Sequence, residues 1–156
     1  MKSGEKGFTL LEVLIVMAIL GLLSMAVMPQ MLPVLDKIRL QSDARDVAQA
    51  LRMARQQAIS TGQPAAVYIY PYASLYRVQD GKNLNFRKGV QCVDTTFAPA
   101  YSGGPPACTF HPGGAPLPRA GTVVLANQRG EKAYIIVNPV VGRVRVSNSP
   151  PSGWTD

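Results

Sequence analysis

The stretch that decides the fold is FTLLEVLIVMAILGLLSMAVM, residues 8–28. Seventeen of its 21 residues are apolar, and about 20 such residues make a helix that crosses a bilayer. A secretory signal peptide fits less well, because its apolar region is about 7–15 residues long and a small-residue cleavage site follows it. Here the residues that follow are Pro29, Gln30 and Met31. We therefore expect a membrane-spanning helix over residues 8–28.

Charge divides the chain into two unlike parts. Lys2 and Lys6 precede the apolar stretch, and positive charge on that side favours an N-terminus held in the cytoplasm with the rest outside it. Residues 29–156 carry 14 Lys+Arg against 7 Asp+Glu, which accounts for the net charge of +7. This division excludes an ordinary cytosolic enzyme, and the lack of a second long apolar run excludes a polytopic membrane protein.

Glu12 interrupts the apolar stretch, where a carboxylate costs a few kcal/mol on insertion scales. One explanation is local: Thr9 and Glu12 have the spacing of a capping box, so Glu12 would satisfy the amide groups of a helix N-terminus. The other explanation depends on the residues around it, which read KGFTLLEV from Lys6 to Val13.

That string closely resembles the processing signature of type IV pilins and of type II secretion pseudopilins. The resemblance implies that a prepilin peptidase removes residues 1–7 by cutting after Gly7 and then methylates the new N-terminal amine of Phe8. It also implies that Glu12 neutralises the N-terminal amine of a neighbouring subunit during filament assembly. The physical chemistry agrees, because a carboxylate and an amine become tolerable in an apolar environment when they pair.

A second helical pattern follows the apolar stretch. Pro29 and Pro33 predict an interruption, since proline removes a helical hydrogen bond and crowds the preceding turn. From residue 34 to residue 60, apolar residues recur at steps of three and four with arginines between them, which indicates an amphipathic helix. Gly62 and Pro64 mark its end. With the apolar stretch it would form one long helix of roughly 80 Å.

Residues 50–59 read ALRMARQQAI, which looks like the helix that precedes a glycine and the first strand in the GspH/FimT subgroup of pilins. The resemblance implies an α+β, type IV pilin-like fold: a long N-terminal helix packed on an antiparallel sheet. The expected divisions are a leader over residues 1–7, a membrane or filament-core helix over 8–28, its amphipathic continuation over 29–62 and a β-rich head over 63–156.

Alternating apolar residues and turn signals predict short strands in the head. The expected strands cover residues 65–70, 75–79, 84–87, 122–126, 133–137 and 143–147. Asp80-Gly81 is a hairpin signal. Residues 97–121 contain six prolines and five glycines, so we expect a long irregular loop there.

Cys92 and Cys108 predict one disulfide, because the chain has an even number of cysteines and its head is expected outside the cytoplasm. The bridge would close a loop of about 17 residues. A metal site with His111 is the weaker alternative, since two cysteines and one histidine are a poor ligand set for zinc. We expect no cofactor and no metal, and the scattered acidic residues offer no pair for acid–base catalysis. The chain is expected to be the substrate of an enzyme and not an enzyme itself.

Gly142-Arg143-Val144-Arg145 is the most informative motif of the head. On a strand, Arg143 and Arg145 would project from one face, about 6.6 Å apart, while the valines fix the strand to the core. The simple explanation is a solvated strand face. The alternative is a clamp for a polyanion, because a guanidinium can donate two hydrogen bonds to one phosphate.

FimT-type minor pilins of naturally transformable bacteria carry a C-terminal Gly-Arg-x-Arg element implicated in DNA binding, and residues 142–145 resemble it. Further basic residues would widen the patch if the fold brings them near; these are Arg119, Arg129 and Lys132. Contact with phosphates would make binding independent of DNA sequence and sensitive to salt.

Two functions remain open. The first is a minor type IV pilin, in or at the tip of a pilus, that binds extracellular DNA for natural transformation. The second is a GspH-type minor pseudopilin of a type II secretion system, with a structural or priming role and no DNA binding. Both imply the same partners: the prepilin peptidase, other pilins, and the inner membrane before assembly.

Overall fold

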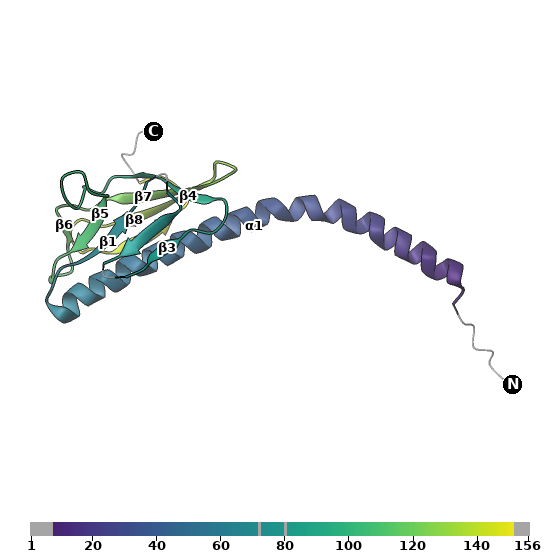
Figure 1. Cartoon of the computed structure of the whole chain (residues 1–156), viewed down its shortest axis with the longest axis horizontal. Coiled ribbons are helices and arrows are strands. Elements are labelled where there is room, and N and C mark those ends of the chain that lie inside the picture. The colour runs from purple at the N-terminus through teal and green to yellow at the C-terminus, as the bar shows by residue number, and fades with distance from the viewer. Residues whose placement is uncertain (1–7, 72, 80, 152–156) are drawn as a thin grey trace. The chain divides into compact units, whose positions relative to one another are not determined.

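The computed structural model describes residues 8–71, 73–79 and 81–151, without the side chains of residues 26–30. The leader with its cleavage residue Gly7 and the turn residue Asp80 lie outside the described residues. Within these described residues, one helix precedes nine strands, and Figure 1 shows the helix beside the strands. The chain divides into an N-terminal unit that ends at Leu35 and a C-terminal unit that begins at Asp36.

Helix α1 spans Leu10–Thr61, and its residues 10–35 belong to the N-terminal unit. Thr9 caps it, because its Oγ1 accepts a hydrogen bond from the Glu12 amide at 3.2 Å. This is the Thr9 half of the capping box that the sequence offers as one explanation for Glu12. The predicted interruption is absent: the backbone stays helical at Pro29 and Pro33. Proline removes one N–H group, but its fixed φ remains compatible with a helix.

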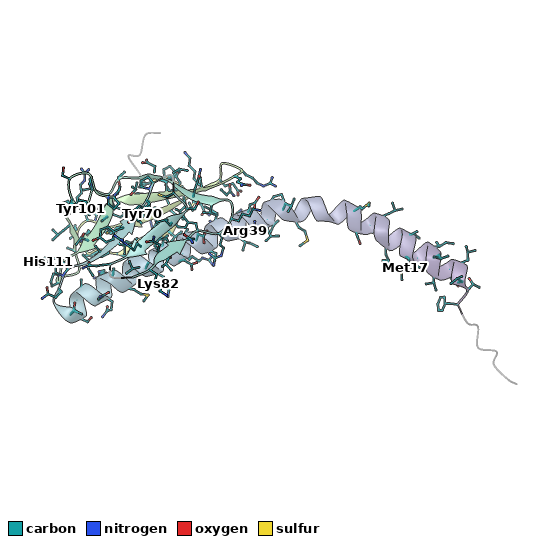
Figure 2. All side chains as sticks on the ribbon, viewed as in Figure 1. Met17, Arg39, Tyr70, Lys82, Tyr101 and His111 are labelled. Carbon is teal, nitrogen blue, oxygen red and sulfur yellow. The ribbon has the colours of Figure 1, made fainter. Side chains whose placement is uncertain are left out.

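The apolar side chains of the N-terminal unit are exposed, from Phe8 at 81 % through Met17 to Met25 (Figure 2). The sequence predicts a membrane-crossing helix over residues 8–28. In the part of the chain that the structure describes, no helix is long and apolar enough to cross a membrane.

In the C-terminal unit, α1 buries one stripe of side chains at helical spacing. The stripe consists of Leu40, Ala44, Val47, Leu51, Ala54 and Ala58. Its alanines are small, so the helix can approach the strands closely. The predicted stop is confirmed, since Gly62 has a φ of 67° and its N–H donates to the Ala58 carbonyl at 3.1 Å, which closes the last turn as in a typical C-cap.

The strands form two antiparallel sheets. The first has the order β3-β2-β1-β5-β6 and the second the order β4-β7-β8-β9. Their bounds are β1 Ala65–Ile69, β2 Leu75–Val78, β3 Asn83–Asn85, β4 Val90–Thr95, β5 Ala107–Phe110, β6 Pro116–Leu117, β7 Thr122–Asn127, β8 Lys132–Val137 and β9 Val144–Ser147. The α+β architecture expected from the sequence, a long N-terminal helix followed by antiparallel strands, is confirmed.

The expected irregular loop over residues 97–121 is wrong in part, because it contains β5 and β6. β5 pairs with β1 through Ala65 and Phe110, and Val67 and Cys108. This long-range pairing has no local signal, and the prolines on either side of β5 lie outside the strand, where they cost no ladder hydrogen bond. β4 was also not predicted; it pairs with β7 from Val90 to Thr95.

The predicted disulfide is not formed, and Cys92 and Cys108 are free thiols. They lie in different sheets, on β4 and β5, and both are completely buried in the core. The Cys92 thiol donates to the Asp94 carbonyl at 3.5 Å. Buried cysteines of this kind pack as small apolar side chains.

Asp43 is a buried carboxylate that connects α1 to the segment before β4. Its Oδ2 accepts a hydrogen bond from the Arg87 amide at 2.9 Å, and the Arg87 guanidinium pairs with both Asp43 and Asp46. Burial raises the pKa of Asp43 above its ordinary value, and the hydrogen bonds from Arg87 oppose that rise. The pairing holds this segment against the helix.

The free thiols give a direct test. Burial raises the pKa of Cys92 and of Cys108 to about 12, and the thiolate is the reactive form. In the folded chain at pH 8 we expect neither to react with a thiol reagent, and both to react after denaturation without reductant. The pH dependence of stability follows from the same shift, because an unfolded thiol has a pKa of about 8.5. The two buried thiols contribute fully to the free energy of unfolding below that pH, and their contribution falls as the pH rises toward 12. An absence of titratable thiols in the denatured chain would contradict the structure.

Candidate anion-binding site on the α1–β9 edge

The connection between β8 and β9 is a tight loop fixed by Asn138. Its Oδ1 accepts hydrogen bonds from the amides of Val140, at 2.9 Å, and Val141, at 3.1 Å. Its main chain also bonds to Arg143 and Gly142, at 2.9 and 3.1 Å. An asparagine side chain that bonds the backbone two residues on is a common way to stabilise a turn. The loop therefore presents Gly142 and Arg143 in a fixed conformation.

Residue 142 is a position that only glycine fits. Its φ is 64°, in the left-handed region that other residues avoid. A Cβ there would lie 2.1 Å from the Gly114 carbonyl oxygen and 3.1 Å from Arg55 Nε. The loop is thus pressed against residue 114 and against α1.

The arginines of the motif project as the sequence predicts. Arg143 and Arg145 are exposed, Val144 is buried and Val146 is half-buried. The strand begins one residue later than expected, at Val144, so Arg143 ends the loop. Arg145 lies opposite Ile136 on β8.

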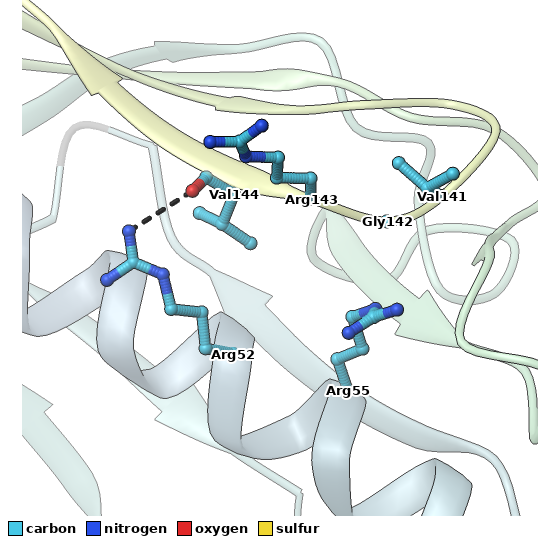
Figure 3. A pocket seen from close by; sticks show the side chains of 6 residues that line it. All are labelled: Arg52, Arg55, Val141, Gly142, Arg143 and Val144. Atoms are coloured by element: carbon cyan, nitrogen blue, oxygen red, sulfur yellow. Dashed lines mark hydrogen bonds between the residues drawn. The ribbon is translucent and has the colours of Figure 1, made fainter.

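Two arginines of α1 join this edge of the head. The Arg52 Nη2 donates to the Val144 carbonyl at 3.1 Å, and the Arg55 Nε donates to the Gly114 carbonyl at 3.1 Å. Figure 3 shows both side chains extending from the helix toward the backbone of residues 142–144, with Arg143 at the end of the loop that precedes β9. A cavity of about 470 Å³ is lined by Arg52, Arg55, Val141, Gly142, Arg143 and Val144.

A second cavity, also about 470 Å³, lies on the same edge. It is lined by Ile136, Val137, Asn138, Pro139, Arg143 and Arg145. Arg143 lines both cavities, so the two share a wall. Among the described residues, none that lines either cavity is acidic.

None of the three further basic residues that the sequence suggested lines either cavity. Val137 pairs with Val144, so Lys132 lies at the opposite end of β8, about 17 Å away at 3.4 Å per residue. Arg129 lies in the turn before Lys132 and pairs with Asp36 at 3.1 Å. Arg119 is exposed three residues before β7 and lines neither cavity.

Arg52 and Arg55 are the site residues that sequence reasoning missed. Their periodicity places them beside the buried stripe of α1, which indicates only a solvated flank. Their position next to Gly142 depends on a contact between residues about 90 apart in the chain. The one available signal was their occurrence within the ALRMARQQAI string itself.

The structure gives no metal site in the described ranges, where no three His, Cys, Asp or Glu side chains gather. His111, the weaker alternative ligand, uses its Nδ1 to accept a hydrogen bond from the Gly113 amide at 3.3 Å. The described residues of this edge offer ionic chemistry, because guanidinium groups line both cavities.

Gly142 provides a stability test with a matched control. Gly130 also has a positive φ, 79°, but a Cβ there would meet nothing within 4 Å. We expect Gly130→Ala to cost about 1 kcal/mol for the left-handed backbone alone. Gly142→Ala should cost about 3 kcal/mol, because its Cβ also displaces the Gly114 carbonyl. Urea unfolding measures both, and equal costs would contradict the close approach.

Two family models match the chain. Residues 2–28 match the prokaryotic N-terminal methylation motif, and residues 43–142 match the type II transport protein GspH. The second match covers more than half of the chain and ends at Gly142, just before Arg143. No curated protein matches.

Solved structures similar to this chain share its fold at low sequence identity. The type IV minor pilin FimU of Pseudomonas aeruginosa is 15% identical, with a TM-score of 0.56 over 72% of this chain and 90% of that chain. The minor pseudopilin EpsH from the type 2 secretion system of Vibrio cholerae is 15% identical, with a TM-score of 0.56 over 70% and 96%. The N-terminal motif, the GspH match and this shared fold together show that the chain belongs to the GspH family of type IV pilins and pseudopilins.

Proposed function

We propose that the chain is a minor type IV pilin that binds extracellular DNA through Arg143 and Arg145 for natural transformation. The observation that carries the proposal is the exposure of both guanidinium groups beside cavities whose described lining includes no carboxylate. The buried Val144 between them fixes the strand, so both arginines remain available to a ligand.

DNA suits this surface because its backbone is a regular array of negative charges. Arginine can bind a phosphate with two parallel hydrogen bonds. Contacts of this kind release counterions and carry no base information, so binding is independent of sequence and weakens with salt. The net charge of +7 favours the approach of any polyanion.

The N-terminal motif supports the assembly part of the proposal. A prepilin peptidase cleaves after Gly7 and methylates Phe8, and Glu12 pairs with the N-terminal amine of an adjacent pilin. Before assembly, the apolar N-terminal segment holds the chain at the inner membrane with its head in the periplasm. In the filament, the exposed apolar side chains of residues 8–25 pack against the same segment of other pilins.

The second candidate is a minor pseudopilin of a type II secretion system with a structural role and no DNA binding. FimU and EpsH match this chain with the same TM-score, so the fold leaves both candidates open. DNA binding separates them.

The test is a mobility-shift and anisotropy titration of the full chain in non-ionic detergent with a DNA duplex. We expect binding at low salt that weakens steeply between about 50 and 200 mM salt. Arg143→Ala with Arg145→Ala should weaken it by at least about tenfold and reduce the slope of log affinity against log salt by about two.

Arg129→Ala with Lys132→Ala is the matched control, because it removes the same charge at the far end of β8. We expect that variant to retain most of the affinity. If the wild-type chain binds no DNA at low salt, the DNA role is wrong and the pseudopilin function is favoured. If both double variants lose the same affinity, the site is not at Arg143 and Arg145.

A further inference from the structure

Arg52 and Arg55 place two more guanidinium groups beside Arg143, on a different element of the fold. We infer that the cavity these three arginines line is a phosphate site, occupied by one phosphodiester of the bound DNA. The inference rests on the proposed DNA binding and extends it, because it assigns the holding of a phosphate to helix α1 as well as to β9.

The two helix arginines are pre-positioned by the fold. Each uses one donor on a backbone carbonyl: Arg52 on Val144 and Arg55 on Gly114. A guanidinium has five N–H donors, and within the described residues the other donors of both side chains have no protein acceptor. Binding therefore costs little side-chain entropy, and several N–H groups stay available for phosphate oxygens.

The ion pairs of the described arginines lie outside this cluster. Arg39 and Arg129 pair with Asp36, and Arg87 pairs with Asp43 and Asp46. In the described part of the chain, no carboxylate pairs with Arg52, Arg55 or Arg143. Three guanidinium groups therefore line the cavity without a carboxylate partner among the described residues.

The second cavity can accommodate the next phosphates of the same DNA strand. It continues from Arg143, the last residue of the loop, to Arg145 on β9. A ligand with repeated phosphates can occupy the first cavity with one group and contact Arg145 with the next. Inorganic phosphate has the same oxyanion chemistry but only one phosphate group, so binding of DNA and binding of inorganic phosphate need separate measurements.

Val141 and Val140 provide a test that leaves every arginine and its hydrogen bonds unchanged. Val141 lines the cavity, whereas Val140 is its more exposed neighbour at 77% and lines neither cavity. Val141→Glu places a carboxylate at the phosphate site, and Val140→Glu makes the same charge change outside it. Both side chains are solvent-exposed, so both variants should fold.

We expect Val141→Glu in the full chain, in non-ionic detergent, to bind a DNA duplex about tenfold more weakly than Val140→Glu does, with a salt slope smaller by about one. In a parallel titration of the wild-type chain with inorganic phosphate, the NMR signals of Arg55 Nε–H and the Gly142 amide should shift. They should not shift in Val141→Glu.

Each of the other possible results contradicts a specific part of the proposal. If the wild-type chain binds DNA and the two valine variants bind it equally, the cavity is not the phosphate site, and the proposed function stands. If inorganic phosphate shifts these signals but DNA does not bind, the ligand is free phosphate and the DNA assignment fails. If neither ligand shifts them, the cavity is not an oxyanion site.

Discussion

The contact on which the rest of this surface depends is the close approach of Gly142 to the carbonyl of Gly114. A Cβ would lie 2.1 Å from that oxygen, so the β8–β9 loop reaches its position only with glycine at residue 142. The same carbonyl accepts the hydrogen bond from Arg55. One backbone oxygen thus fixes both the loop that precedes Arg143 and an arginine of α1. The basic edge therefore depends on this packing as well as on Arg143 and Arg145.

Gly142 can come close to Gly114 because the side chains that α1 buries against the strands are small. Ala44, Ala54 and Ala58 are completely buried in its stripe, and small side chains let the backbones come close. Arg52 then reaches the Val144 carbonyl on β9. Packing in the core and charge on the edge are therefore coupled: the alanines place α1, and α1 supplies two of the three arginines at the first cavity.

Much of the fold follows from the sequence because its signals are local. The apolar period of α1, its end at Gly62 and the strands near Val67, Val123 and Ile135 all depend on neighbouring residues. β5 and the pairing of Cys108 with Val67 do not, since they depend on strands distant in the chain. The disulfide prediction was wrong for a related reason: an even cysteine count says nothing of which sheet each thiol occupies. The exposure of Arg143 and Arg145 could be predicted because strand alternation is local. Arg52 and Arg55 join them only through the tertiary fold.

The central claim is that DNA binds where α1 meets β9. The most direct measurement is a map of amide chemical-shift changes in the full chain, in non-ionic detergent, on adding a short DNA duplex. We expect the largest changes at Arg52, Arg55 and residues 141–145, with little change at Arg129 and Lys132. Changes centred on the β7–β8 turn, or no changes at low salt, would contradict it.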